Sequence, residues 1–133
     1  MKGAKAFVDT NILIYAYDST AGQKHERAGR IVSDLWDSGL GVLSTQVLQE
    51  FFVYVTAKIP KPLDVTTAKG IVNDLLAWET MVVDGPSILK GVDIHLKYQY
   101  AFWDALIIET AISIPGTKPA KKSFPTETLA FHP

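Results

Sequence analysis

Three acidic residues, Asp9, Glu50 and Asp104, each lie in an apolar part of the sequence. Asp9 directly follows a short apolar run. Glu50 lies within Leu-Gln-Glu-Phe-Phe-Val at 48–53, and Asp104 lies within Phe-Trp-Asp-Ala-Leu-Ile at 102–107. An acid in such surroundings is costly to ionise unless a cation or hydrogen bonds compensate it. Carboxylate oxygens suit Mg²⁺ or Mn²⁺, and such an ion can activate a water for attack on phosphorus. The three acids could therefore form a shared metal site.

Each of these acids also has an ordinary structural interpretation. Asp9 could act only as a helix cap or turn residue after a strand. Glu50 could be solvated along the seam of a helix, and Asp104 could complement the positive end of its own helix. A shared metal site explains all three positions together, whereas the structural interpretations explain them one at a time.

The elements that would position these acids alternate along the chain. Short apolar runs predict strands, and apolar residues at helical spacing predict the segments between them. Strands separated by helices of this length pair in parallel through right-handed crossovers. The fold class is therefore α/β, a three-layer arrangement with a central parallel sheet, helices on both faces and strand one in the middle. The predicted strands are 4–8, 40–43 and 81–83, and the predicted helices are 12–16, 23–37, 46–58, 64–78, 87–97 and 102–112.

In such a sheet, Asp9 lies at a corner between the first strand and the first helix. Thr10 and Asn11 follow it and are predicted to be the N-cap residues of that helix. Because ligands bind at the carboxyl ends of parallel strands, this corner is the expected place for a site. Helices that start above the same edge could bring Glu50 and Asp104 towards Asp9.

Composition limits the possible functions. The chain has 133 residues, of which 47% are hydrophobic and 20% are charged, as expected for one globular domain over 1–133. There is no apolar run long enough to cross a membrane and no signal-peptide pattern, so we expect a cytoplasmic protein. Without cysteine, any metal must be held by oxygen or imidazole ligands. A net charge of −1 gives no overall attraction to nucleic acid, although a bound metal would supply local positive charge.

Other residue types are weaker candidates for chemistry. His25, His95 and His132 are scattered without the spacing of metal ligands. Ser44 has no His–Asp pattern nearby, so we expect it to cap a helix or to support the site as a hydrogen-bond donor. There is no glycine-rich phosphate loop.

Three motifs resemble the acidic motifs of the PIN-domain nucleases, in the order of that family. They are Phe-Val-Asp-Thr-Asn-Ile-Leu at 7–13, Leu-Ser-Thr-Gln-Val-Leu-Gln-Glu-Phe at 43–51 and Tyr-Ala-Phe-Trp-Asp-Ala-Leu-Ile at 100–107. The match is closest to the VapC toxins of toxin–antitoxin pairs and covers residues 4–113. The resemblance implies a PIN-like fold and a metal-dependent endoribonuclease that is neutralised by a cognate antitoxin protein.

The resemblance also implies roles for particular residues. Asp9, Glu50 and Asp104 become the metal-binding and catalytic acids, and Thr10 or Asn11 supports the first of them. The cofactor is Mg²⁺ or Mn²⁺, and the substrate is RNA. Members of the family commonly form dimers, and this chain has more large apolar side chains than one small core can hide, so we expect a homodimer. The side chains that suggest it are Trp36, Phe52, Tyr54, Met81, Tyr98 and Tyr100.

The chain departs from the family pattern in its last part, 115–133. Members usually have a fourth carboxylate there, and the one acid after Glu109 is Glu127, which is a weak candidate for that ligand. Three prolines within 115–125 remove backbone donors, so we expect a mostly irregular tail with a brief pairing at 123–124 or 129–131. The alternatives are a degenerate PIN-like domain that binds RNA or a protein without cleaving, and another magnesium-dependent phosphoesterase.

Overall fold

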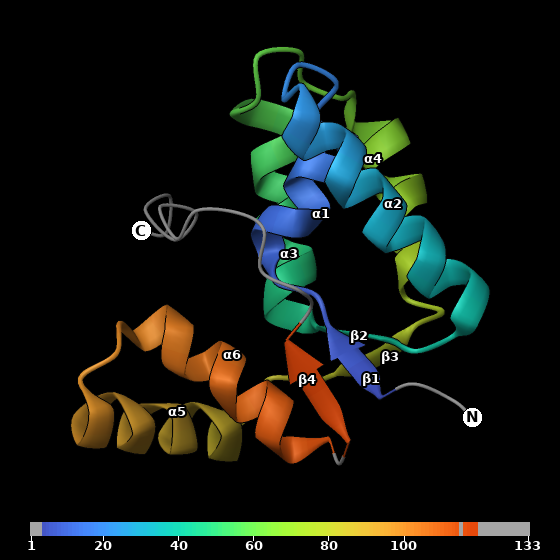
Figure 1. Cartoon of the computed structure of the whole chain (residues 1–133). Helices are drawn as coiled ribbons and strands as arrows, with labels where there is room; N and C mark the ends of the chain where they lie inside the picture. The colour runs from blue at the N-terminus through green and yellow to red at the C-terminus, as the bar shows by residue number, and fades with distance from the viewer. Residues whose placement is uncertain (1–3, 115, 120–133) are drawn as a thin grey trace.

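The computed structural model describes residues 4–114 and 116–119 (Figure 1). Glu127 and the strand pairings predicted at 123–124 and 129–131 lie outside these residues. In chain order the described elements are β1 (Lys5–Phe7), α1 (Thr10–Tyr17), α2 (Gln23–Ser38), β2 (Gly41–Ser44), α3 (Thr45–Ala57), α4 (Val65–Leu75), β3 (Glu79–Met81), α5 (Gly85–Tyr98), α6 (Phe102–Ser113) and β4 (Thr117–Pro119).

Within the described residues, the strands form one parallel sheet in the order β3-β2-β1-β4. The first strand is internal, with Ala6 opposite Gly41 on one side and Lys118 on the other. The predicted α/β class and the central first strand are therefore confirmed. Both follow from the alternation of short apolar runs with longer helices, because parallel pairing requires a long crossover.

Two strands differ from the sequence prediction. We expected β3 at 81–83, but it is Glu79–Met81, and Val82, which follows it, is 65% exposed. We placed no strand before 123, whereas β4 pairs in parallel with β1 at Thr117–Pro119. Proline is tolerated there because β4 is at an edge of the described sheet and Pro119 is its last residue. Gly116, with φ of 79°, turns the chain into this strand.

Acidic and hydroxyl side chains start most of the helices. Asp9, Ser44, Asp64 and Asp84 each accept a hydrogen bond from the backbone N–H three residues further on, which satisfies a donor that the helix leaves unpaired. Ser44 therefore caps α3, as expected. The prediction that Thr10 and Asn11 cap the first helix was wrong, because Asp9 is the N-cap and Thr10 is the first helical residue.

The buried core lies between β1, β2 and the helices α1 to α4. Phe7, Leu13, Leu43 and Phe51 are among its fully buried side chains. In Figure 1 helices α1 to α4 form one group at the carboxyl ends of β1 and β2, while α5 and α6 form a separate hairpin beside β4. No helix within the described residues is long and apolar enough to cross a membrane.

Candidate active site

The first part of the site is the corner between β1 and α1. Val8 is fully buried and its N–H donates to the carbonyl of Val42, which fixes the end of the strand. Asp9 follows with φ −79° and ψ 170°, and its Oδ1 accepts a hydrogen bond of 3.2 Å from the N–H of Ile12. The capping bond holds the half-buried carboxylate of Asp9 at the carboxyl end of the central strand.

The second part of the site is Glu50, in the second turn of α3. Thr10 Oγ1 donates to Glu50 Oε1 at 2.6 Å, a contact between residues 40 positions apart. Gln46 Nε2 donates to Glu50 Oε2 at 3.2 Å, from one turn earlier in the same helix. Both oxygens of Glu50 therefore accept hydrogen bonds, which fix the orientation of the carboxylate.

The structure shows one contact of the Thr10 hydroxyl, which donates to Glu50. The resemblance implied that Thr10 or Asn11 would support Asp9, and this stays a prediction. Thr10 is 1% exposed and Asn11 is 5% exposed. Because Thr10 directly follows Asp9, its hydrogen bond brings the first two predicted acids into one region. Ser44 Oγ accepts from the N–H of Val47 at 3.2 Å and thus serves the start of α3.

The third predicted acid, Asp104, is half-buried in the first turn of α6. The residue before this helix is Ala101, which has no polar side chain to cap it, so a carboxylate in the first turn complements the helix dipole. Within residues 4–114 and 116–119, no three acidic or histidine side chains form a group that could hold a metal ion. The hydrogen bond from Thr10, the residue after Asp9, thus links the corner between β1 and α1 to Glu50.

Sequence reasoning missed Gln46, which is 5% exposed and contacts Glu50 directly. The signal was available, because residues four apart face the same side of a helix and Gln–acid pairs at this spacing form hydrogen bonds. It also missed Glu109, a 5%-exposed acid on α6. Ser113 Oγ donates to Glu109 Oε2 at 2.7 Å, so this carboxylate has a local partner within its own helix.

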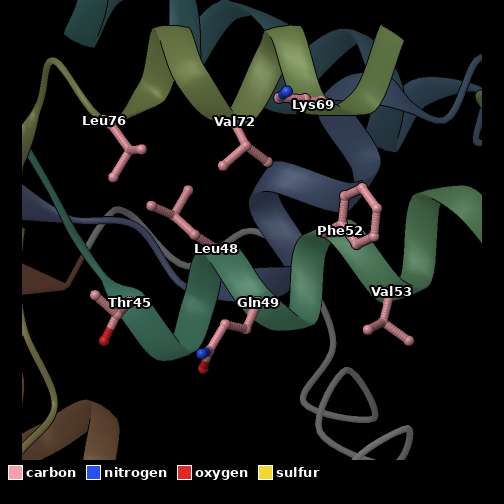
Figure 2. Close-up of a pocket in the computed structure, with 8 residues that line it drawn as sticks. All are labelled: Thr45, Leu48, Gln49, Phe52, Val53, Lys69, Val72 and Leu76. Carbon is pink, nitrogen blue, oxygen red and sulfur yellow. The ribbon is translucent and has the colours of Figure 1, made fainter. Parts of the chain in front are cut away.

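A separate apolar groove lies between α3 and α4 and has a volume of about 460 Å³. Figure 2 shows Leu48 and Phe52 from α3 facing Val72 from α4 and Leu76, the C-cap of α4, with Lys69 at one end. Neither Asp9 nor Glu50 lines it. The groove offers few polar atoms, so we assign the candidate chemistry to the acids.

Comparisons with known proteins agree with this architecture. Residues 6–117 match the family model of the PIN domain. Among solved structures, the chain is similar to the VapC20 toxin of Mycobacterium tuberculosis, described as a sarcin–ricin loop cleaving toxin, with a TM-score of 0.62 and 16% sequence identity over 82% of each chain. No curated protein matches the sequence.

Proposed function

We propose that this chain, which belongs to the PIN domain family, is a metal-dependent endoribonuclease of the toxin–antitoxin type. The observation that carries the proposal is the 2.6 Å hydrogen bond from Thr10 to Glu50, because it joins two acidic motifs at the carboxyl end of the central strand. The similar protein from M. tuberculosis is a sarcin–ricin loop cleaving toxin, which supports the choice of RNA as the substrate class.

The donor set fits a hard divalent cation. Mg²⁺ is commonly bound by one or two carboxylates together with water and phosphate oxygens, and the acids here offer only oxygen. Asp9 and Glu50 would hold Mg²⁺ or Mn²⁺, with Asp104 as the third ligand and Glu127 as a weak candidate for a fourth. When bound, the ion would lower the pKa of an attacking water and offset the charge of the phosphodiester.

The protein's own groups have defined tasks in this proposal. The N–H of Ile12 orients Asp9, and the Thr10 hydroxyl orients Glu50 from a buried position. Both contacts fix the direction in which a carboxylate oxygen points, because each oxygen accepts from a donor that the fold holds in place. The acids are thereby set to bind a cation without a large rearrangement of β1, α1 and α3.

A second candidate function is a degenerate PIN-like domain that binds RNA or a protein without cleaving. It is favoured by one observation, that no three acidic or histidine side chains within the described residues form a group that could hold a metal ion. This candidate predicts that the chain binds RNA and shows no metal-dependent cleavage.

The proposal includes partners that follow from the toxin class. These are a cognate antitoxin that covers the acidic site and a second copy of the chain. The proposed place of action is the cytoplasm. Exposed apolar side chains support a homodimer, since Trp36 is 40%, Tyr98 is 54% and Tyr100 is 46% exposed.

The proposal is tested by incubating the purified chain with a labelled structured RNA in Mn²⁺ or Mg²⁺. We expect cleavage that EDTA stops and that Asp9→Asn abolishes. Asp34→Asn, which neutralises an exposed acid on α2, is the matched control and should cleave like the wild type. Cleavage by Asp9→Asn at the wild-type rate would overturn the proposal. RNA binding without cleavage by the wild type would support the degenerate domain.

A further inference from the structure

Gln46 is a buried polar residue at the start of α3, on the same side of the helix as Glu50. Its two neighbours in sequence have structural tasks, because Thr45 Oγ1 accepts from the N–H of Val83 and Val47 is fully buried in the core. An amide side chain that is 95% shielded from water requires partners for both its donor and its acceptor. The burial of the Gln46 side chain therefore requires hydrogen-bond partners for its amide.

The orientation of the Gln46 amide follows from Glu50. An ionised carboxylate can only accept hydrogen bonds, so Gln46 must present its Nε2 group to Glu50 Oε2, at 3.2 Å. The other end of the amide, Oε1, then faces away from that oxygen. It is buried and has no hydrogen-bond partner among the residues that the structure describes.

An unpaired buried acceptor is unfavourable, because it has lost its hydrogen bonds to water and gained none in the protein. A flip of the amide would not help, because it would place Gln46 Oε1 against Glu50 Oε2, and two oxygens repel each other. Among the described residues the Gln46 acceptor thus lacks a donor, and it belongs to the same amide group whose nitrogen contacts Glu50. A divalent cation such as Mg²⁺ keeps several of its waters when it binds protein carboxylates, and those waters are strong donors.

We propose that Gln46 is a positioning residue of the metal site, holding Glu50 through Nε2 and accepting a hydrogen bond from the hydrated cation through Oε1. This inference rests on the proposed function, since it requires a cation at Asp9 and Glu50. Groups that orient a metal ligand typically change metal affinity by about 10–100-fold when they are removed. Gln46 is predicted to belong to this class although it contributes no charge.

The test is direct titration of the full-length chain with Mn²⁺ by calorimetry and by the paramagnetic resonance of the free ion. Gln46→Met keeps the length of the side chain and removes both polar groups, so Mn²⁺ should bind about 10–100-fold more weakly. Gln49→Met makes the same change at an exposed position of the same helix, and its affinity should stay within about twofold of the wild type.

Gln46→Glu distinguishes a contact with the cation from a purely structural role. In EDTA the new carboxylate repels Glu50, so the variant should melt below the wild type. If Oε1 lies beside the cation, Mn²⁺ should raise the melting temperature of Gln46→Glu by more than that of the wild type, because the added charge becomes a partner of the ion.

Three results would overturn the inference. The first is a Gln46→Met variant that binds Mn²⁺ as tightly as the wild type, whatever its thermal stability, since Gln46 would then serve the fold alone. The second is a Gln46→Glu variant that Mn²⁺ stabilises no more than the wild type. In both cases binding by the wild type leaves the proposed function standing. The third is a wild-type chain that binds no Mn²⁺, which would remove the inference and the proposed function together.

Discussion

The substitution Thr10→Val tests the hydrogen bond between the first two acidic motifs. Valine has the shape of threonine, so the substitution removes the 2.6 Å donor to Glu50 without opening a cavity at a position that is 1% exposed. It leaves the carboxylate of Glu50 with the hydrogen bond from Gln46 and against a new methyl group. The variant should therefore fold, with a lower free energy of unfolding.

The expected loss can be derived from the type of contact. A hydrogen bond to a charged group contributes about 1.5–3 kcal/mol. Glu50 is half-buried, so water can replace part of what Thr10 supplied, and we expect a loss at the lower end, about 1.5–2 kcal/mol. Thr56→Val is the matched control in α3. The Thr56 hydroxyl donates to the backbone carbonyl of Phe52 at 2.7 Å, within the helix, and its loss should change stability by less than about 0.5 kcal/mol.

The assay is urea unfolding of the wild type, both single variants and a double-mutant cycle that combines Thr10→Val with Glu50→Ala. If the two side chains interact, the double variant should lose less than the sum of the single losses, by about 1 kcal/mol or more. Additive losses, or a Thr10→Val loss no larger than that of Thr56→Val, would show that the contact is absent in solution. The link between the first two motifs would then be refuted.

Four further predictions follow from the structure. Asp9→Asn should leave the free energy of unfolding without metal within about 0.5 kcal/mol or raise it, since asparagine caps as well as aspartate, whereas Asp9→Ala should lower it by about 1 kcal/mol in the same urea assay. The backbone N–H and hydroxyl of Ser87 lower the pKa of Asp84 below its usual 3.8, so the stability from this cap is present above about pH 4 and lost as the pH falls below it. Between pH 6 and pH 2 the melting temperature should therefore depend less on pH for Asp84→Asn than for the wild type. Gly41→Ala would place a Cβ 2.4 Å from the ring of Trp78 and should lower the free energy of unfolding by about 1–3 kcal/mol in urea. Light scattering at micromolar concentration should give the mass of a dimer, and a monomer mass would remove the expected homodimer.

Much of the fold could be predicted from local patterns. Apolar spacing located the helices to within a few residues, because a helix that covers a sheet must repeat its buried positions every three or four residues. The run before Asp9 identified the central strand, since a strand covered on both faces is apolar throughout. β4 was missed because three residues are too few to show a period, and because the one proline within it, Pro119, is its last residue.

The acidic residues of the candidate site could be predicted from the sequence, but the hydrogen bonds between them and their neighbours could not. Residue type and apolar surroundings selected Asp9 and Glu50, but the partner of Thr10 lies 40 residues away and depends on how α1 packs on α3. Nothing in the local sequence specifies that packing. The same limit applies to Asp104, because its distance from the other acids depends on the position of the α5–α6 hairpin, which packs on itself and beside β4.

The most direct test of the central claim is the position of Mn²⁺ in crystals of the chain, located by its anomalous scattering. We expect a peak at the carboxyl end of β1, within about 2.1–2.3 Å of the carboxylate oxygens of Asp9 and Glu50, with Asp104 approaching the same ion. The peak should be absent from crystals of Asp9→Asn. A Mn²⁺ ion bound away from Asp9 and Glu50, or no bound ion at saturating Mn²⁺, would contradict the assignment of these acids as the metal site.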